Sequence, residues 1–355
     1  MVDDAAPTDN RLEAAPTDNG LDERSIPDSI LLAPLRAAIH HGRLLGYAPW
    51  LIYAMLMKPR QTVAGIGTYY SIRRSALWRS CVRWLLVKGS SRQPRYIRAQ
   101  TKPYDPKRQY LLAAHPHGIL NYGWWNLFCR FGLNFVDGVQ MIMCVAPLVK
   151  FYPLYGEIFN DRVTDASKRT IDSILKGYHP AAKTCAAEKQ LPLTPAIIPG
   201  GFSEATYTAA HPTIEYAYMA DRMGFIKCAI EAGVDIIVAY SFGLNDMYST
   251  LAWQRHVRAV KAQAWGLPTV LWTGPYLLGN TPFTEQITVV TFDPFPASKY
   301  TLDQLSQAHS DYMAYLKACF DSKKSECGHG HKELEFIGKS KPPNAMATQA
   351  PRSRL

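Results

Sequence analysis

The chain has 355 residues, of which 47% are hydrophobic and 12% aromatic, which excludes a disordered protein and permits a sizeable core. Its formal charge of +10 is unevenly placed, because residues 1–39 carry eight acidic side chains against three arginines, whereas residues 40–110 carry fourteen Lys or Arg against Asp105 alone. The seven cysteines include no Cys-x-x-Cys pair, and the first 25 residues are acidic and polar, without a cleaved secretory signal; together these features predict reduced thiols on the cytosolic side.

Residues 1–39 are predicted to be a disordered acidic tail. Positions 4–21 hold a tandem nine-residue repeat, DAAPTDNRL followed by EAAPTDNGL. The repeat is rich in Pro, Asp and Asn and has no core-forming pattern, which predicts a solvated tail outside the folded domain.

Residues 40–92 are predicted to associate with a membrane. The run Leu44–Met57 is uncharged, but its fourteen residues fall short of the roughly 20 that span a bilayer. A second uncharged stretch, Gln61–Ile72, precedes a segment at 73–88 in which arginines alternate with Trp and Leu, a composition typical of the lipid headgroup boundary. We expect a shallow hairpin or interfacial segments. The alternative is a buried helix with a loop, followed by a helix that packs on the domain and keeps its arginines in water.

Residues 93–338 show the pattern of an α/β domain, with apolar runs that end at turn residues and helical stretches between them. The polar residues 339–355 are expected to form a loose tail. The predicted strands are Tyr110–Ala114, Ala196–Ile198, Asp235–Tyr240 and Ile287–Phe292, and the predicted helices are Ala166–Tyr178, Asp221–Ala232, Leu251–Trp265 and Leu302–Phe320.

The strongest local signal is a His-Pro-His-Gly sequence at the end of the first of these strands. Side chains at i and i+2 of an extended segment share a face, so His115 and His117 are expected to point into one site at the carboxyl end of the strand. An imidazole with a pKa near 6.5 can accept a hydroxyl proton and return it to a leaving group. Two alternatives stay open: a metal site, for which no further histidine follows the neighbouring strands, and a histidine that only caps a turn.

A second signal follows the next strand. Gly200 and Gly201 allow close approach of the backbone and expose N–H groups that can stabilise an anion, although such a pair is also an ordinary turn. Glu204 could position an acceptor or orient a histidine, or it could be a solvated surface residue.

A third signal is the block from Asp221 to Tyr248. Its pattern predicts a helix, then a buried strand, then a turn that positions Asn245. Arg222 and Lys227 lie near the helix start, where they could receive the phosphates of a coenzyme A thioester, or they could be exposed helix cations.

These three blocks, in this order and at these separations, resemble the type 2 diacylglycerol acyltransferase family, which includes monoacylglycerol and wax-alcohol acyltransferases. The resemblance covers roughly residues 95–338. It implies an α/β, mixed-sheet acyltransferase domain that esterifies diacylglycerol to triacylglycerol with acyl-CoA as a substrate and with neither cofactor nor metal. It also implies the endoplasmic reticulum membrane and lipid droplets as locations, with the catalytic domain facing the cytosol.

Site residues carry over where the positions match. Some plant members replace the first histidine of the motif by glutamate, which favours His117 over His115 as the base. The implied catalytic residues are His117, His115 and Glu204, and the implied substrate-binding residues are Pro116, Gly118, Gly200, Gly201, Arg222, Gly224, Phe225, Lys227 and Asn245.

The sequence also departs from related patterns. It reads RYIRAQTKPYD where many family members carry a tyrosine-phenylalanine-proline motif. A glycerophosphate-type acyltransferase would carry an aspartate after its histidine and an arginine at Tyr207, and both are missing, which favours a neutral acceptor. The alternatives are a monoacylglycerol or long-chain alcohol acyltransferase and a non-catalytic lipid-binding protein. The expected partners are the two substrates and membrane lipids and not nucleic acid, and an oligomer stays open.

Overall fold

The computed structural model describes the acyltransferase-like region together with a short N-terminal part. The described residues are 57–73, 75–81, 95–119, 121, 124, 136–147, 162–207, 211–250, 257–258, 261, 270, 272–273 and 286–339.

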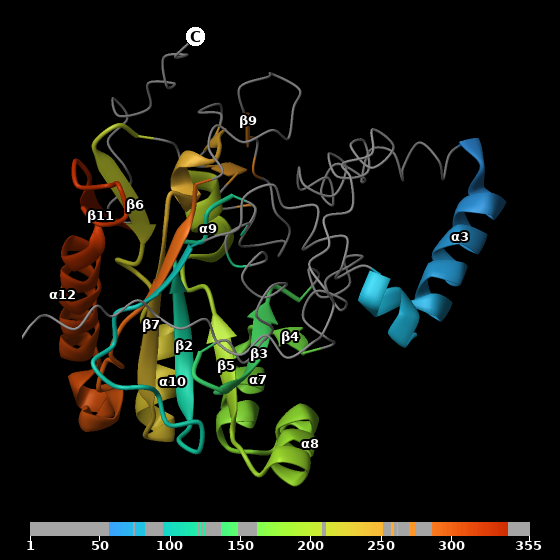
Figure 1. Cartoon of the computed structure of the whole chain (residues 1–355), viewed down its shortest axis with the longest axis horizontal. Helices are drawn as coiled ribbons and strands as arrows, with labels where there is room; N and C mark the ends of the chain where they lie inside the picture. Colours follow the sequence, from blue (N-terminus) through green and yellow to red (C-terminus); the bar gives the residue numbers. More distant parts are fainter. Residues whose placement is uncertain are drawn as a thin grey trace, which may run out of the picture.

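A mixed seven-stranded sheet forms the centre of the described domain (Figure 1), with the strand order β1-β10-β7-β2-β5-β3-β4. β10 runs antiparallel to β7 and pairs in parallel with β1, whereas the other neighbours are parallel. The strands are β1 Arg95–Arg98, β2 Tyr110–His115, β3 Gln140–Val145, β4 Val163–Asp165, β5 Leu193–Ile197, β7 Asp235–Phe242 and β10 Thr288–Thr291. The sheet is therefore a mixed α/β sheet, as the sequence predicts.

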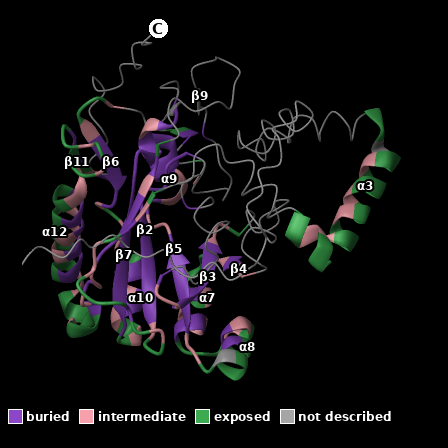
Figure 2. Cartoon of the chain, viewed as in Figure 1, coloured by how far each residue is buried: buried purple, intermediate pink, exposed green. Residues whose placement is uncertain are grey.

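The central strands β2, β5 and β7 are buried along their whole length, which explains their continuous apolar runs. Alternate residues face opposite sides, so Leu111 belongs to one core cluster and Leu112 to the other. Each is at most 1% exposed, and burial of such a side chain contributes about 1.5–3 kcal/mol. Figure 2 shows the buried sheet in purple and the exposed outer face of the flanking helix α12 in green.

Helices α7 (Lys168–Leu175), α10 (Gly224–Ala232) and α12 (Leu305–Lys323) contribute to the core cluster on the Leu111 face. The remaining short elements are α8 Pro180–Lys189, α9 Gly201–Tyr207, η2 Leu244–Asp246, η3 Ala297–Lys299 and η4 Leu302–Gln304. α9 follows β5, and η2 follows β7 after Gly243, whose φ of 85° is in the left-handed region that favours glycine.

Two small sheets accompany the main one. β6 (Ile214–Tyr218) pairs in parallel with β11 (Glu333–Ile337), and β8 (Ser249–Thr250) pairs antiparallel with β9 (Trp272–Thr273).

A buried charged cluster links the β6–β11 pair to η2. The Lys332 ammonium donates to Glu215 at 3.1 Å and to Asp246 at 2.5 Å, and Lys332 is only 3% exposed. His329 lies 3.2 Å from the same aspartate. Because buried charges require partners, this cluster fixes the position of β6 relative to the carboxyl end of β7.

Most of the predicted elements that fall on described residues are confirmed. All four predicted strands are present, and the predicted helix near residue 302 begins as η4 and continues as α12. The helix predicted from Asp221 begins only at Gly224, because residues 219–222 form a turn in which Ala220 N donates to Ile337 O at 3.0 Å. The predicted tails 1–39 and 340–355, the run 44–56 and most of 251–265 lie outside the described residues.

The N-terminal part contains α3 (Pro59–Ile72), which Figure 1 shows apart from the sheet. Several large apolar side chains of α3 are exposed, among them Val63 at 59% and Tyr70 at 42%. Among the described residues, the structure contains no helix with the length and apolar character needed to cross a bilayer. Membrane association of residues 40–92 stays a prediction.

Candidate active site

The first histidine of the His-Pro-His-Gly sequence is the last residue of β2. His115 is fully buried, and its Nε2 atom lies 2.9 Å from the Tyr312 hydroxyl on α12. The Phe225 ring packs edge-on against Tyr312 at 5.1 Å between ring centroids. Burial lowers the pKa of His115 to about 3, so the ring is neutral at physiological pH. These contacts place His115 in the core between the sheet and α12.

The second histidine lies two residues beyond, where the chain has left the strand. His117 Nδ1 is 2.7 Å from the Gly118 carbonyl oxygen, which can only accept, so Nδ1 carries the proton. Nε2 then presents a lone pair and forms no hydrogen bond with the described residues. Burial, reinforced by the Arg222 charge, lowers the pKa of His117 to about 4. The geometry provides a neutral imidazole whose basic nitrogen is unbonded within the described part of the chain.

The Glu204 carboxylate holds the loop that carries His117. One oxygen accepts the backbone N–H of His117, and the other accepts the backbone N–H of Tyr218 at 2.7 Å. Glu204 is 1% exposed. Burial raises its pKa to about 7, although both N–H groups and Arg222 oppose this shift. The carboxylate therefore acts on the backbone of His117 rather than on its ring.

Glycines make room for this arrangement. A Cβ atom at Gly200 would overlap the Glu204 carboxylate, so glycine is needed here for the carboxylate to fold back over the turn. Gly118 has a φ of 61°, and a Cβ there would lie 2.6 Å from Cγ of Leu244. Gly201 has a φ of 54° and begins α9. The loop after β2 and the turn before α9 thus pack too closely for any side chain at 118 or 200.

Arg222 brings a positive charge to the same turn. Its Nη2 atom donates to the Ser203 hydroxyl at 3.1 Å and to the Gly200 carbonyl at 3.3 Å. Its guanidinium carbon lies 5.0 Å from the centre of the Tyr218 ring. The charge of Arg222 lowers the pKa of both His117 and Glu204.

Other predicted site residues lie elsewhere or serve the framework. Lys227 on α10 is 3.8 Å from Glu231, and no contact joins it to His117. The Asn245 amide donates to the carbonyl of Tyr216 on β6 at 3.2 Å. The Pro116 carbonyl accepts from the Trp124 indole at 3.3 Å, and a Cβ at Gly224 would meet no atom within 4 Å.

The structure therefore brings together His117, Glu204, Gly200 and Arg222, which the sequence treats as separate signals. It gives the two histidine rings different partners, because the chain leaves the strand after His115. The contacts also involve three residues that the sequence analysis did not single out: Tyr312, Tyr218 and Ser203. Tyr312 lies on the apolar face of the predicted helix Leu302–Phe320, but no local sequence pattern indicated that it contacts a histidine.

Within the described ranges, no three His, Cys, Asp or Glu side chains lie together in a way that could hold a metal ion.

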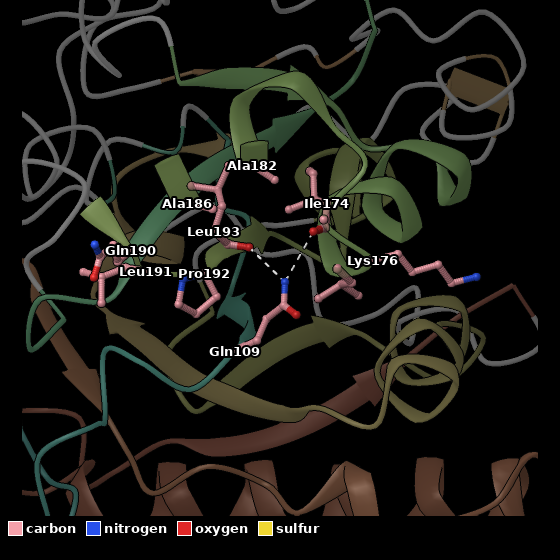
Figure 3. Close-up of a pocket in the computed structure, with 11 residues that line it drawn as sticks. Gln109, Ile174, Lys176, Ala182, Ala186, Gln190, Leu191, Pro192 and Leu193 are labelled. Atoms are coloured by element: carbon pink, nitrogen blue, oxygen red, sulfur yellow. Dashed lines mark hydrogen bonds between the residues drawn. The ribbon is translucent and has the colours of Figure 1, made fainter. Parts of the chain in front are cut away.

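A cavity of about 490 Å³ lies at the other end of the sheet, lined by α7, α8 and the start of β5. Figure 3 shows the Gln109 amide donating to the Ile174 and Leu193 carbonyls, both at 3.3 Å. Gln109 precedes β2 and Leu193 begins β5, so the cavity is at the amino ends of these strands. His117 follows the carboxyl end, and the cavity is not part of its surroundings.

Residues 69–336 match the family model described as diacylglycerol acyltransferase. Human 2-acylglycerol O-acyltransferase 3 is 26% identical over 277 residues, which are 72% of this chain and 74% of that protein. Diacylglycerol O-acyltransferase 2 of Dictyostelium discoideum is 25% identical, over 79% and 82% of the two chains. Human acyl-CoA wax alcohol acyltransferase 2 is 24% identical, over 73% and 79%.

Among solved structures, the 1-acyl-sn-glycerophosphate acyltransferase of Thermotoga maritima aligns with 83% of this chain and 95% of its own at 10% identity. The TM-score of 0.38 lies below the level at which two folds are taken to correspond.

Proposed function

The chain belongs to the diacylglycerol acyltransferase family, and we propose that it transfers the acyl group of acyl-CoA to the free hydroxyl of diacylglycerol, forming triacylglycerol. The observation that carries the proposal is the state of His117: a neutral ring whose Nδ1 proton is held by the Gly118 carbonyl and whose Nε2 forms no hydrogen bond with the described residues. Such a ring is suited to general-base catalysis.

In this mechanism His117 Nε2 takes the proton of the acceptor hydroxyl while the hydroxyl oxygen attacks the thioester carbonyl carbon. The tetrahedral intermediate then collapses, the carbon–sulfur bond breaks, and the coenzyme A thiolate leaves. The thiolate takes the proton from His117, which restores the base. A thiolate is a good leaving group, so the mechanism calls on no cofactor or metal.

The contacts of Glu204 and His115 support positioning roles. Both Glu204 oxygens are occupied by backbone N–H groups of His117 and Tyr218, so this carboxylate fixes the base loop. His115 is buried against Tyr312 and supports the strand end from which the loop departs.

A neutral acceptor is favoured by the residue at the position where a glycerophosphate-type enzyme would carry arginine. Tyr207 is 7% exposed and stacks on the Tyr218 ring at 5.9 Å. It presents no charge to an acceptor phosphate. The names of the relatives given above include 2-acylglycerol, diacylglycerol and wax alcohol as acceptors, and diacylglycerol is our choice among them.

We further propose that the protein works at the endoplasmic reticulum membrane and on lipid droplets, with the catalytic domain facing the cytosol. Support comes from α3, where exposed apolar side chains accompany Arg73, whose guanidinium lies 5.2 Å from the Tyr70 ring. Cations beside aromatic rings suit a headgroup boundary.

Expression in cells that lack all triacylglycerol synthesis, followed by lipid analysis, tests the proposal. The wild-type protein should restore triacylglycerol, and His117→Ala at equal protein level should not. The control is His331→Ala, which changes an exposed histidine and should restore triacylglycerol as the wild type does. Wax esters without triacylglycerol would move the assignment to an alcohol acyltransferase. Purified protein in micelles that transferred labelled acyl groups to none of the three acceptors would indicate a lipid-binding protein.

A further inference from the structure

The loop between β6 and α10 is fixed to its neighbours. The Met219 carbonyl lies 2.8 Å from Nε2 of His309 on α12, and Arg222 N donates to the same carbonyl at 3.0 Å. The side chain of Asp221 accepts the backbone N–H of Lys339 after β11. These bonds fix the backbone position from which the Arg222 side chain extends.

The guanidinium of Arg222 is held by hydrogen bonds and forms no direct ion pair with the described residues. One of its nitrogens is bonded to Ser203 and Gly200, and its face lies on Tyr218. Among the described residues its buried Nε atom has no hydrogen-bond partner. In the part of the chain that the structure describes, no carboxylate oxygen lies within the 4.0 Å of an ion pair with it. A partly buried cation without a direct ion pair is costly, which indicates that it meets an anion during function.

The position of the Arg222 guanidinium limits which anion it can bind. The Gly200–Glu204 turn that binds Arg222 is also the turn whose carboxylate holds the His117 loop. A nucleotide phosphate placed here would keep its negative charge beside the buried Glu204 carboxylate for as long as the donor is bound. An oxyanion that develops on the substrate carbonyl must form within a few ångströms of the base, and its charge exists only during the reaction.

We propose that Arg222 stabilises the oxyanion that forms on the thioester carbonyl, an inference that rests on the acyl-transfer function proposed above. The attacking hydroxyl oxygen forms a bond to the carbonyl carbon and its proton passes to His117. The π electron pair moves to the carbonyl oxygen, which becomes an anion next to the guanidinium. Collapse restores the double bond, breaks the carbon–sulfur bond and releases thiolate, which takes the proton from His117.

Two acyl donors separate this role from phosphate binding. Oleoyl-CoA carries the nucleotide phosphates, whereas the oleoyl thioester of N-acetylcysteamine has the same reacting carbonyl and no phosphate. Arg222→Gln should lower kcat about 10²- to 10³-fold with both donors and leave KM little changed. Arg222→Lys keeps the charge and should recover part of the loss.

The control is Lys183→Gln, which removes an exposed cation from α8, and thermal unfolding establishes that each variant is folded. A raised KM for oleoyl-CoA with normal rates on the truncated donor would overturn the inference in favour of phosphate binding. An unchanged kcat for folded Arg222→Gln with both donors would also overturn it. Absence of transfer by the wild-type protein with every acceptor would instead reject the proposed function, and the inference with it.

Discussion

Replacement of Gly200 by alanine tests whether the Glu204 carboxylate holds the base loop. The new Cβ would occupy the position of the carboxylate, while the backbone at 200 is not in the left-handed region, so the clash is the whole effect. Displacement of the carboxylate removes the acceptor from two buried N–H groups, those of His117 and Tyr218. Each such loss costs about 1–3 kcal/mol, which gives about 2–6 kcal/mol for Gly200→Ala.

Urea denaturation of the detergent-solubilised protein measures the free energy of unfolding, and acyl transfer measures the activity. Both should fall in Gly200→Ala. Gly224→Ala is the matched stability control, because a Cβ at the start of α10 meets no atom within 4 Å, and alanine there should be neutral or stabilising by up to about 1 kcal/mol.

A double-mutant cycle sharpens the test. Glu204→Ala removes the two atoms nearest to the new Cβ, and of the three nearest it leaves the Glu204 Cβ, at 2.7 Å. Gly200→Ala should therefore cost clearly less in the Glu204→Ala background than in the wild type. Equal costs in the two backgrounds, or an unchanged activity in Gly200→Ala, would refute the reasoning.

Three further predictions concern titration and core contacts. Because burial lowers the pKa of His117 to about 4 and raises that of Glu204 to about 7, any limb of kcat/KM near neutral pH should belong to Glu204 and vanish in Glu204→Gln; a limb near neutral pH that persists in Glu204→Gln would contradict this. Burial lowers the pKa of His329, but the bond to Asp246 outweighs burial and leaves this pKa above its ordinary value of 6.5. The stability that protonated His329 contributes is therefore complete below about pH 6.5 and is lost as pH rises through the pKa of the folded protein. Urea midpoints between pH 6 and 8.5 should therefore fall less in His329→Gln than in the wild type. Tyr312→Phe leaves the first histidine of the motif without its buried partner and should cost about 1–3 kcal/mol in urea unfolding; equal stability would show that the bond does not form.

The sequence predicted the central strands and the place of the candidate site. An uninterrupted apolar run such as β2 is typical of a strand buried on both faces, and a polar motif directly after it must lie at the carboxyl edge of a parallel sheet. These features are local, so the position of the His-Pro-His-Gly loop could be predicted. The strands β6 and β11 were not predicted, because they form a two-stranded sheet between segments that are more than a hundred residues apart.

The roles within the site depended on contacts that no local pattern contains. His117 and Glu204 are 87 residues apart, and His115 and Tyr312 are 197 residues apart. The sequence placed the two histidines on one face because extended residues alternate, but only the packed chain shows one ring against α12 and the other in a loop held by a carboxylate. The sequence by itself determined the family, the mixed α/β class with four strands of the main sheet (β2, β5, β7 and β10), and the edge where chemistry is expected. The tertiary structure decided which groups touch, because a hydrogen bond requires two atoms within about 3 Å, and the folding of distant segments alone brings them there.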